Sequence, residues 1–265
     1  MKKAENELNK ILNDKLHGST DILDQVYNHI LRNKSDINYL LKASKKISQK
    51  LSHFPVITNF LKDLENILML NDPKTLNDFL NNFGSNETNK YARFFENEME
   101  VLSKLKTVLT ISHSRTLINV FNHWKKSFPK LKIIICESRP LNEGILMAKE
   151  LSELKIRTEI ITEAMSAKII DEVDAVILGA DQILNNGNIV NKTGSRMLAI
   201  LAKHHKLPVY VIASPYKIVK KKIIQHEKPA DKSLLSKKSK WIKFRNDNFE
   251  EIEKELITKI LLVKS

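Results

Sequence analysis

From about residue 105 onward, short apolar runs alternate with amphipathic segments of helical length. Apolar runs of four or five residues with polar ends are typical of strands that are buried on both faces. The predicted strands are residues 106–110, 133–136, 158–161, 175–178 and 209–213. The predicted helices between them are residues 114–127, 142–154, 164–170 and 193–205. Strands separated by helices imply a parallel sheet covered on both sides, so we expect a Rossmann-like, doubly wound α/β domain.

The N-terminal part of the chain has a different pattern, which predicts helices. Apolar residues recur at spacings of three and four between residues 22 and 68. Asp72-Pro73 and residues 81–89 are rich in helix-breaking residue types and are predicted to separate helices. We therefore expect a helical domain over residues 1–104 and a Rossmann-like domain over residues 105–265.

The end of the chain contains two further features. A Lys-rich segment covers residues 217–243 and is either a solvated loop or a patch that attracts phosphate or a partner. Residues 248–262 are predicted to form a helix and then an apolar strand.

Composition limits the classes of protein that fit this chain. The net charge of +13 suits nucleic acid or an acidic partner, but no basic motif interleaved with aromatic residues accompanies it, so nucleic acid is not favoured. The single cysteine, Cys136, excludes an internal disulfide and a cysteine-based zinc site. No apolar run is long enough to span a membrane, and the first ten residues do not resemble a signal peptide. These features together favour the cytoplasm.

Glycine is concentrated where the backbone is specialised. Four of the six glycines lie between residues 144 and 194, and the predicted strand 175–178 leads directly into the segment 179–195. Open α/β sheets bind their ligands at the carboxyl ends of strands, so this polar segment is the first candidate site. The chain lacks a G-x-G-x-x-G turn, and we expect neither a dinucleotide nor another cofactor, and no metal.

Several motifs resemble a known family. Residues 136–144, CESRPLNEG, resemble the E-S-R-P-x-x-E-G signature of the alpha, beta and delta subunits of translation initiation factor 2B. Residues 179–195 resemble the G-A-D, N-G and N-K-x-G-[ST] block of the same family, and residues 209–217 resemble the strand and loop that follow. The resemblance covers about residues 105–265. Methylthioribose-1-phosphate and ribose-1,5-bisphosphate isomerases belong to the same superfamily, so the fold alone does not select the function.

The resemblance also bears on catalysis. In the related isomerases, a cysteine after the first strand of the α/β domain works with the aspartate of G-A-D to move a proton between sugar carbons. Here Ser112 takes the cysteine position and Asp181 the aspartate position. A serine hydroxyl has a far higher pKa than a thiol and is a poor proton shuttle. His113 is either an alternative acid or base or a residue that faces solvent or a neighbouring subunit. The isomerases' N-terminal R-G-A-P-like phosphate motif is also absent, and both departures argue against isomerase activity.

A ligand site of mixed charge is expected around these motifs. Asp181 either contacts the ligand or caps its own turn. Lys192 would neutralise a phosphate and Asn191 would bind a sugar hydroxyl, while Arg139 either binds phosphate or pairs with a neighbouring glutamate. Helix N-termini bind anions, and the side chains expected at two such termini are Ser114, Arg115 and Ser195.

The expected function follows from the resemblance and these departures. It is that of a regulatory subunit that binds a sugar phosphate or nucleotide, initiation factor 2, or both, and that forms homo- or heterodimers with related subunits through its α/β domain. The alternative is a sugar-phosphate isomerase that uses Asp181. A third hypothesis is an RNA-binding module that uses the Lys-rich segment.

Overall fold

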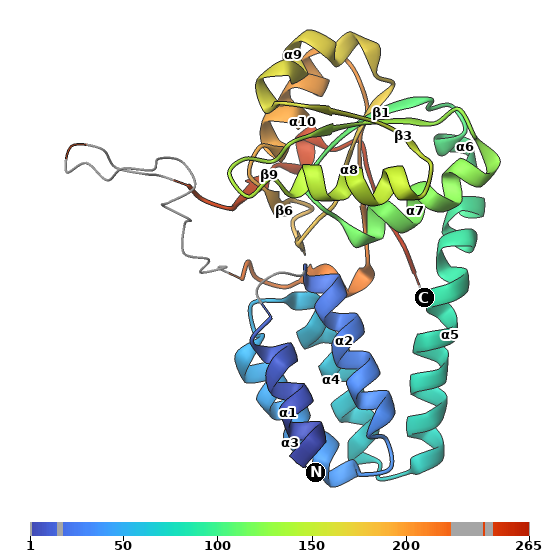
Figure 1. Cartoon of the computed structure of the whole chain (residues 1–265), viewed down its shortest axis with the longest axis vertical. Coiled ribbons are helices and arrows are strands. Elements are labelled where there is room, and N and C mark those ends of the chain that lie inside the picture. The colour runs from blue at the N-terminus through green and yellow to red at the C-terminus, as the bar shows by residue number, and fades with distance from the viewer. Residues whose placement is uncertain (1, 15–17, 224–240, 242–245, 265) are drawn as a thin grey trace.

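The N-terminal region consists of helices in the computed structural model, which describes residues 2–14, 18–223, 241 and 246–264. Helices α1 to α4 pack side by side, and the longer α5 runs beside them up to the α/β region (Figure 1). The helices of this region are α1 (Lys2–Leu12), α2 (Ser19–Arg32), α3 (Ile37–Lys50), α4 (Pro55–Met69), α5 (Pro73–Asn97) and α6 (Met99–Leu102). The first strand begins at Thr107, and the division into two domains at residue 104 stays a prediction.

Helix α5 corrects one prediction and confirms another. The break at Asp72-Pro73 is confirmed, because the Asp72 side chain caps α5 by accepting from the amides of Lys74 and Thr75. The break predicted over residues 81–89 is wrong, because α5 continues through it. One end of α5 contributes Leu80 to the core of the helical bundle, and the other contributes Phe94 to the core beside the sheet. Packing at both ends therefore outweighs the low helix propensity of the polar middle.

The central sheet has the expected doubly wound form. Its six strands are all parallel and lie in the order β10-β7-β4-β1-β2-β3. They are β1 (Thr107–Ile111), β2 (Lys132–Cys136), β3 (Arg157–Ile161), β4 (Ala175–Leu178), β7 (Val209–Ala213) and β10 (Lys259–Leu262). The prediction of a helical region followed by a Rossmann-like domain is confirmed. The five predicted strands agree with the observed bounds to within one residue; they are β1, β2, β3, β4 and β7.

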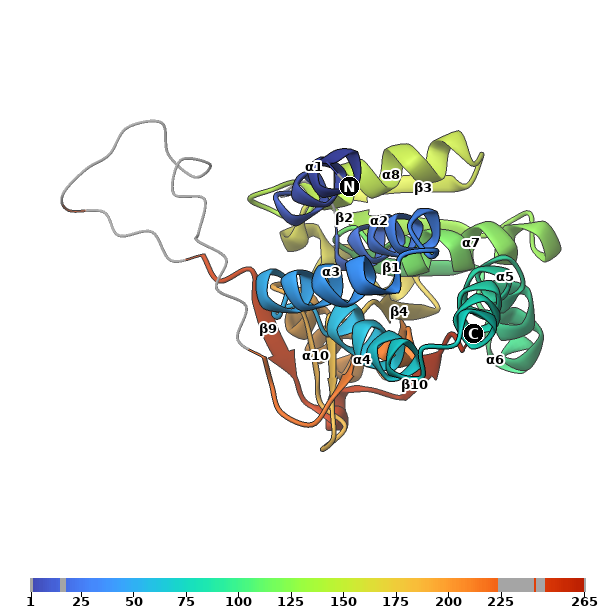
Figure 2. The ribbon, with the colours of Figure 1, turned by 90° about the horizontal axis from the view of Figure 1, so that it is seen from below.

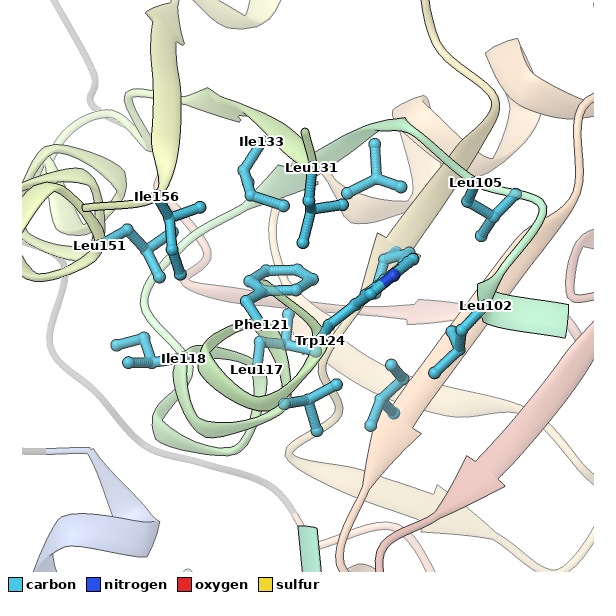
Figure 3. Close-up of a cluster of buried hydrophobic side chains, with 14 of the residues drawn as sticks. Leu102, Leu105, Leu117, Ile118, Phe121, Trp124, Leu131, Ile133, Leu151 and Ile156 are labelled. Carbon is cyan, nitrogen blue, oxygen red and sulfur yellow. The ribbon is translucent and has the colours of Figure 1, made fainter. Parts of the chain in front are cut away.

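Helices cover both faces of this sheet. Helices α7 (Arg115–Ser127) and α8 (Glu143–Glu153) pack on one face, together with the end of α5. Helices α9 (Ser166–Ile169) and α10 (Ser195–His204) pack on the other. In Figure 2, α8 and α10 lie on opposite sides of the sheet. Figure 3 shows Phe121 and Trp124 of α7 directed toward Leu131 and Ile133, so this face is closed by large buried side chains.

A second, smaller sheet lies beside the first. Its strands are β5 (Gln182–Leu184), β6 (Ile189–Lys192), β8 (Ile218–Val219) and β9 (Phe249–Ile252), in the order β8-β5-β6-β9. The helix predicted to begin at residue 248 is wrong, because β9 forms there and pairs antiparallel with β6. The apolar strand predicted after it is present as β10. Pairing with β6 overrides a Glu-rich local sequence that favours a helix.

The order of the strands places a crevice at one point of the sheet. The chain runs from β1 outward to β3 and then returns to the other side of β1 to form β4. The connections that leave the carboxyl ends of β1 and β4 therefore diverge, which opens the position where doubly wound proteins bind ligands.

Two predictions concern the rest of the chain. The Lys-rich segment 217–243 falls mostly on residues 224–240 and 242–245, which lie outside the described residues. None of the helices in the described part of the chain combines the length and the apolar character needed to cross a bilayer.

Gly144 allows α8 to approach β2 closely, which yields a stability prediction. A Cβ atom at Gly144 would lie 1.8 Å from the backbone oxygen of Cys136. We expect Gly144→Ala to lower the free energy of unfolding by about 1–3 kcal/mol, because backbone must shift to admit the methyl group. Urea unfolding measures the change. The control is Gly18→Ala, where the nearest atom is 3.9 Å away; an equal loss in both variants would contradict the assignment.

Candidate functional site

A small cavity lies at the crevice between the carboxyl ends of β1 and β4. Its volume is about 60 Å³. It is lined by residues 18–21 from the start of α2, residues 111–115 after β1, residues 179–181 after β4, Asn191 and Lys217. The cavity is thus built from both the helical region and the α/β region.

Two helix N-termini meet at this cavity. Helix α2 begins at Ser19, after the N-cap Gly18, and helix α7 begins at Arg115. The N-cap of α7 is Ser114, whose side chain accepts a hydrogen bond from the amide of Leu117 at 3.3 Å. Helix N-termini carry partial positive charge, so both helices favour an anion in this space.

An ion network crosses from the helical region to the α/β region beside the cavity. Arg115 Nε donates to Asp21 at 2.7 Å, and Arg115 Nη1 donates to Glu150 at 2.5 Å. His113 Nε2 lies 2.8 Å from the other oxygen of Glu150. Burial works against the charge on Arg115, but its hydrogen bonds with the two carboxylates outweigh burial and raise its pKa.

Glu150 responds to the same network in the opposite direction. Burial alone would raise the pKa of Glu150, but hydrogen bonds from His113 and Arg115 outweigh burial and lower it. Glu150 therefore stays ionised and holds Arg115 at the edge of the cavity.

Lys217 is a cavity residue that the sequence analysis did not single out. It follows β7 on a short 3₁₀ turn (Pro215–Lys217), and its side chain is buried although it lines the cavity. Burial lowers the pKa of Lys217, while the nearby carboxylates of Asp181 and Asp21 oppose that shift. The turn is fixed to α4, because Asn59 Nδ2 donates to the backbone oxygen of Tyr216 at 2.8 Å.

Five of the predicted site residues line this cavity. They are Ser112, Ser114, Arg115, Asp181 and Asn191. Ser112 has a left-handed backbone (φ 68°), and its amide donates to Ser138 Oγ at 2.7 Å. The side-chain nitrogen of Asn191 donates to Ser195 at 2.8 Å, so the amide oxygen of Asn191 remains the atom that an incoming hydroxyl could reach.

The structure does not bring the other three predicted residues to the cavity. Lys192 is buried, forms an ion pair with Glu143, and has its ammonium 5.9 Å from the centre of the Phe249 ring. Ser195 is fully buried behind Asn191, and Arg139 is exposed on the loop after β2. Lys192 points away from the cavity because it directly follows Asn191 in β6, and successive side chains of a strand lie on opposite faces.

The N-terminus of α10 also differs from the expectation of an anion site. A side-chain oxygen of Glu250 accepts from the amides of Gly194 and Arg196, at 2.7 and 2.8 Å. This internal carboxylate occupies the position at which an external anion would bind.

The only cysteine of the chain does not belong to the cavity. Cys136 is fully buried in the core under α9 and α10. Burial raises the pKa of its thiol to about 11, although a hydrogen bond with Ser166 opposes the shift. A thiol in this position is neutral at physiological pH and does not act as a nucleophile or a base.

The fold and the crevice define a doubly wound α/β protein with a helical region that closes part of the crevice. The chain belongs to the Initiation factor 2 subunit family, which it matches over residues 5–262.

Relatives within this family carry different names. The chain is 29% identical to a ribose 1,5-bisphosphate isomerase of Methanocaldococcus jannaschii, and the match spans 83% of this chain and 81% of that protein. It is 35% identical to translation initiation factor eIF2B subunit alpha of Dictyostelium discoideum over 43% of this chain, and it spans only 36% of that relative.

Solved structures agree with the fold. The translation initiation factor eIF-2B of Pyrococcus horikoshii superposes with a TM-score of 0.78 at 19% identity, over 99% of this chain and 96% of that one. The tetrameric eIF2B-beta2-delta2 complex from C. thermophilum matches with a TM-score of 0.63 at 15% identity, over 98% of this chain and 88% of that one.

The lowered pKa of Glu150 predicts how stability depends on pH. A carboxyl group whose pKa is lower in the folded protein stabilises it above the unfolded-state pKa, and that contribution is lost as the pH falls through the folded-state value. We expect Glu150→Gln to lower the free energy of unfolding at pH 7 by about 1 kcal/mol. The difference from the wild type should shrink below the ordinary pKa of 4.5.

Urea unfolding between pH 7 and pH 3 measures this effect. The control is Glu153→Gln, an exposed glutamate on the same helix. A difference between wild type and Glu150→Gln that stays constant over this pH range would contradict the network described above.

Proposed function

We propose that this chain is a regulatory subunit of the initiation factor 2B type, which binds a sugar phosphate or nucleotide in the cavity between β1 and β4. The observation that carries the proposal is the composition of the cavity. Two helix N-termini and two basic side chains, Arg115 and Lys217, face one small space at the switch point of the sheet. Asp181 and Asn191 add the acceptors that sugar hydroxyls require.

The chemistry of the cavity supports binding rather than turnover. Moving a proton between two sugar carbons requires a group that both gives and takes a proton near neutral pH. Ser112 stands where the related isomerases have cysteine, and its hydroxyl does not ionise in that range. Cys136 cannot replace that thiol, because it is buried in another part of the core with a raised pKa.

An isomerase is the second candidate. It is favoured by the match to the M. jannaschii ribose 1,5-bisphosphate isomerase, which extends over most of both chains. Asp181 would then be the catalytic acid and base, with His113 as the nearest substitute for the missing thiol.

Assembly with related subunits fits the surface of the α/β region. Helix α10 exposes two large apolar side chains, Met197 and Ile200, on the face away from the sheet. Apolar patches of this kind mark protein interfaces, so we propose that this face takes part in a homo- or heterodimer. The net charge of +13 suits an acidic partner surface, such as one on initiation factor 2.

Removing the buried lysine tests the ligand site. We expect Lys217→Met to weaken the binding of a phosphorylated ligand about 10- to 100-fold, because a charge-assisted contact is lost from a desolvated position. Isothermal titration calorimetry with ribose 1,5-bisphosphate, methylthioribose 1-phosphate and AMP measures the effect. Lys220→Met, an exposed lysine three residues later, is the control. Equal losses in both variants, or none in either, would contradict the assignment of Lys217.

Turnover separates the two candidate functions. We expect no conversion of ribose 1,5-bisphosphate or methylthioribose 1-phosphate by the wild-type protein in a phosphorus NMR time course, because the hydroxyl of Ser112 does not ionise near neutral pH. Conversion that Asp181→Asn abolishes would instead select the isomerase. Co-purification with initiation factor 2 subunits from the native host, unaffected by Asp181→Asn, would support the regulatory role.

A further inference from the structure

We propose that Asp21 is a built-in competitor of the ligand: its carboxylate occupies Arg115 in the empty protein, and a phosphorylated ligand must displace it and thereby release the start of α2. This inference rests on the proposed function of the cavity and adds a regulatory step to it.

The distribution of charge around the cavity supports this step. The two basic side chains, Arg115 and Lys217, are accompanied by three acidic ones, Asp21, Glu150 and Asp181. A phosphate group that enters the cavity therefore meets a guanidinium, that of Arg115, which is already paired with two carboxylates. Binding becomes favourable when the ligand replaces one of these carboxylates, since two anions at one cation repel each other.

Asp21 is the carboxylate best placed to be replaced. It accepts from Arg115 Nε at 2.7 Å and also lies close enough to Lys217 to influence its ionisation. Glu150 and Asp181 are held by the α/β region itself, on α8 and directly after β4. Asp21 instead belongs to the first turn of α2, so it can leave without disturbing the central sheet.

The size of the cavity leads to the same conclusion. Its volume of about 60 Å³ is well below the roughly 300 Å³ at which small-molecule pockets usually begin. A sugar phosphate therefore requires one lining segment to move. The segments after β1 and β4 are anchored by buried strands, whereas residues 18–21 are joined to the α/β region here by the Asp21–Arg115 ion pair.

Displacement of Asp21 by a ligand would change the packing of the helical region. The core of the helical bundle contains Ile22, Val26 and Ile30 of α2, so a shift of its first turn reaches the packing of the bundle. Glu150 would keep Arg115 in place after Asp21 leaves, because the guanidinium uses a different nitrogen for each carboxylate. The ligand and Asp21 then compete for the guanidinium of Arg115. The protein has two states, one with Arg115 paired to Asp21 and one with Arg115 bound to the ligand, and this competition couples the cavity to the helical bundle.

The test uses inorganic phosphate as the probe and the full-length chain. We expect Asp21→Asn to bind phosphate roughly tenfold more tightly than the wild type by calorimetry, because the competing charge is gone while the shape of the side chain is kept. The control is Asp24→Asn, which removes a carboxylate one turn further along α2, away from the cavity, and should bind phosphate as the wild type does. Circular dichroism confirms that both variants are folded.

Hydrogen exchange gives a second readout. Phosphate should accelerate exchange of the amides of residues 22–25 in the wild type, and in Asp21→Asn this exchange should already be fast without phosphate. If the wild type binds phosphate and Asp21→Asn binds it no more tightly, the competitor role is overturned and the ligand site stands. If neither binds phosphate, both proposals fall. Tighter binding by Asp24→Asn as well would also overturn the specific role of Asp21.

Discussion

One partly buried cation at the carboxyl edge of the parallel sheet, the guanidinium of Arg115, sets the main constraint on this structure. A buried charge is tolerated only when it is paired and hydrogen-bonded. Arg115 obtains one partner, Glu150, from the α/β region, and a second, Asp21, from the helical region. The relative placement of the two regions is therefore tied to the electrostatics of the cavity, and the cleft cannot change without changing that pairing.

The sequence predicts the central sheet well, because each buried parallel strand is an apolar run with polar ends. Ile133, Ile134 and Ile135, for example, have no other reasonable location than a strand covered on both faces. The second sheet was missed since its strands are only two to four residues long. One signal was available: Asn186-Gly187 lies between Ile183 and Ile189, and Asn-Gly between apolar residues is a strong indication of a hairpin.

The helical errors have a different cause. The polar middle of α5 contains Gly84, and the low helix propensity of glycine predicts a break there when the local sequence alone is considered. In the folded chain the hydroxyl of Tyr27 lies 2.2 Å from the position that a Cβ of residue 84 would take, and it donates to the backbone oxygen of Leu80. Glycine is thus used there to admit a neighbouring helix, which is information that no local pattern carries.

Some of the cavity residues could be predicted from the sequence, and others are brought to the cavity only by the packing of the folded chain. Ser112 and Asp181 directly follow strands, so the rule that ligands bind at carboxyl ends places them at one edge. Lys217 follows β7 and could have been found by the same rule, because the ends of parallel strands share that edge. Asp21 could not have been found by this rule, since it reaches the cavity only because α2 packs against the α/β region. The failure of the Lys192 prediction has a local cause: neighbouring residues of β6 point to opposite faces, so Asn191 reaches the cavity and Lys192 lies against Glu143.

The proposed regulatory subunit and an isomerase place different chemical demands on the same fold. Under the proposed function, the α/β scaffold and the two helix N-termini would serve either role, because they would position a phosphorylated ligand and favour its negative charge, while the aspartate after β4 would accept from sugar hydroxyls. Turnover additionally needs a proton carrier whose pKa lies near the ambient pH, and under the proposed correspondence of Ser112 with the isomerases' cysteine, a hydroxyl does not supply one. Under this proposal, binding energy that an enzyme would use to stabilise a transition state is available to displace Asp21. Under this proposal, a chain that binds its ligand without chemical change can use the binding free energy to move α2. A regulatory subunit requires such a link between ligand binding and a change in structure.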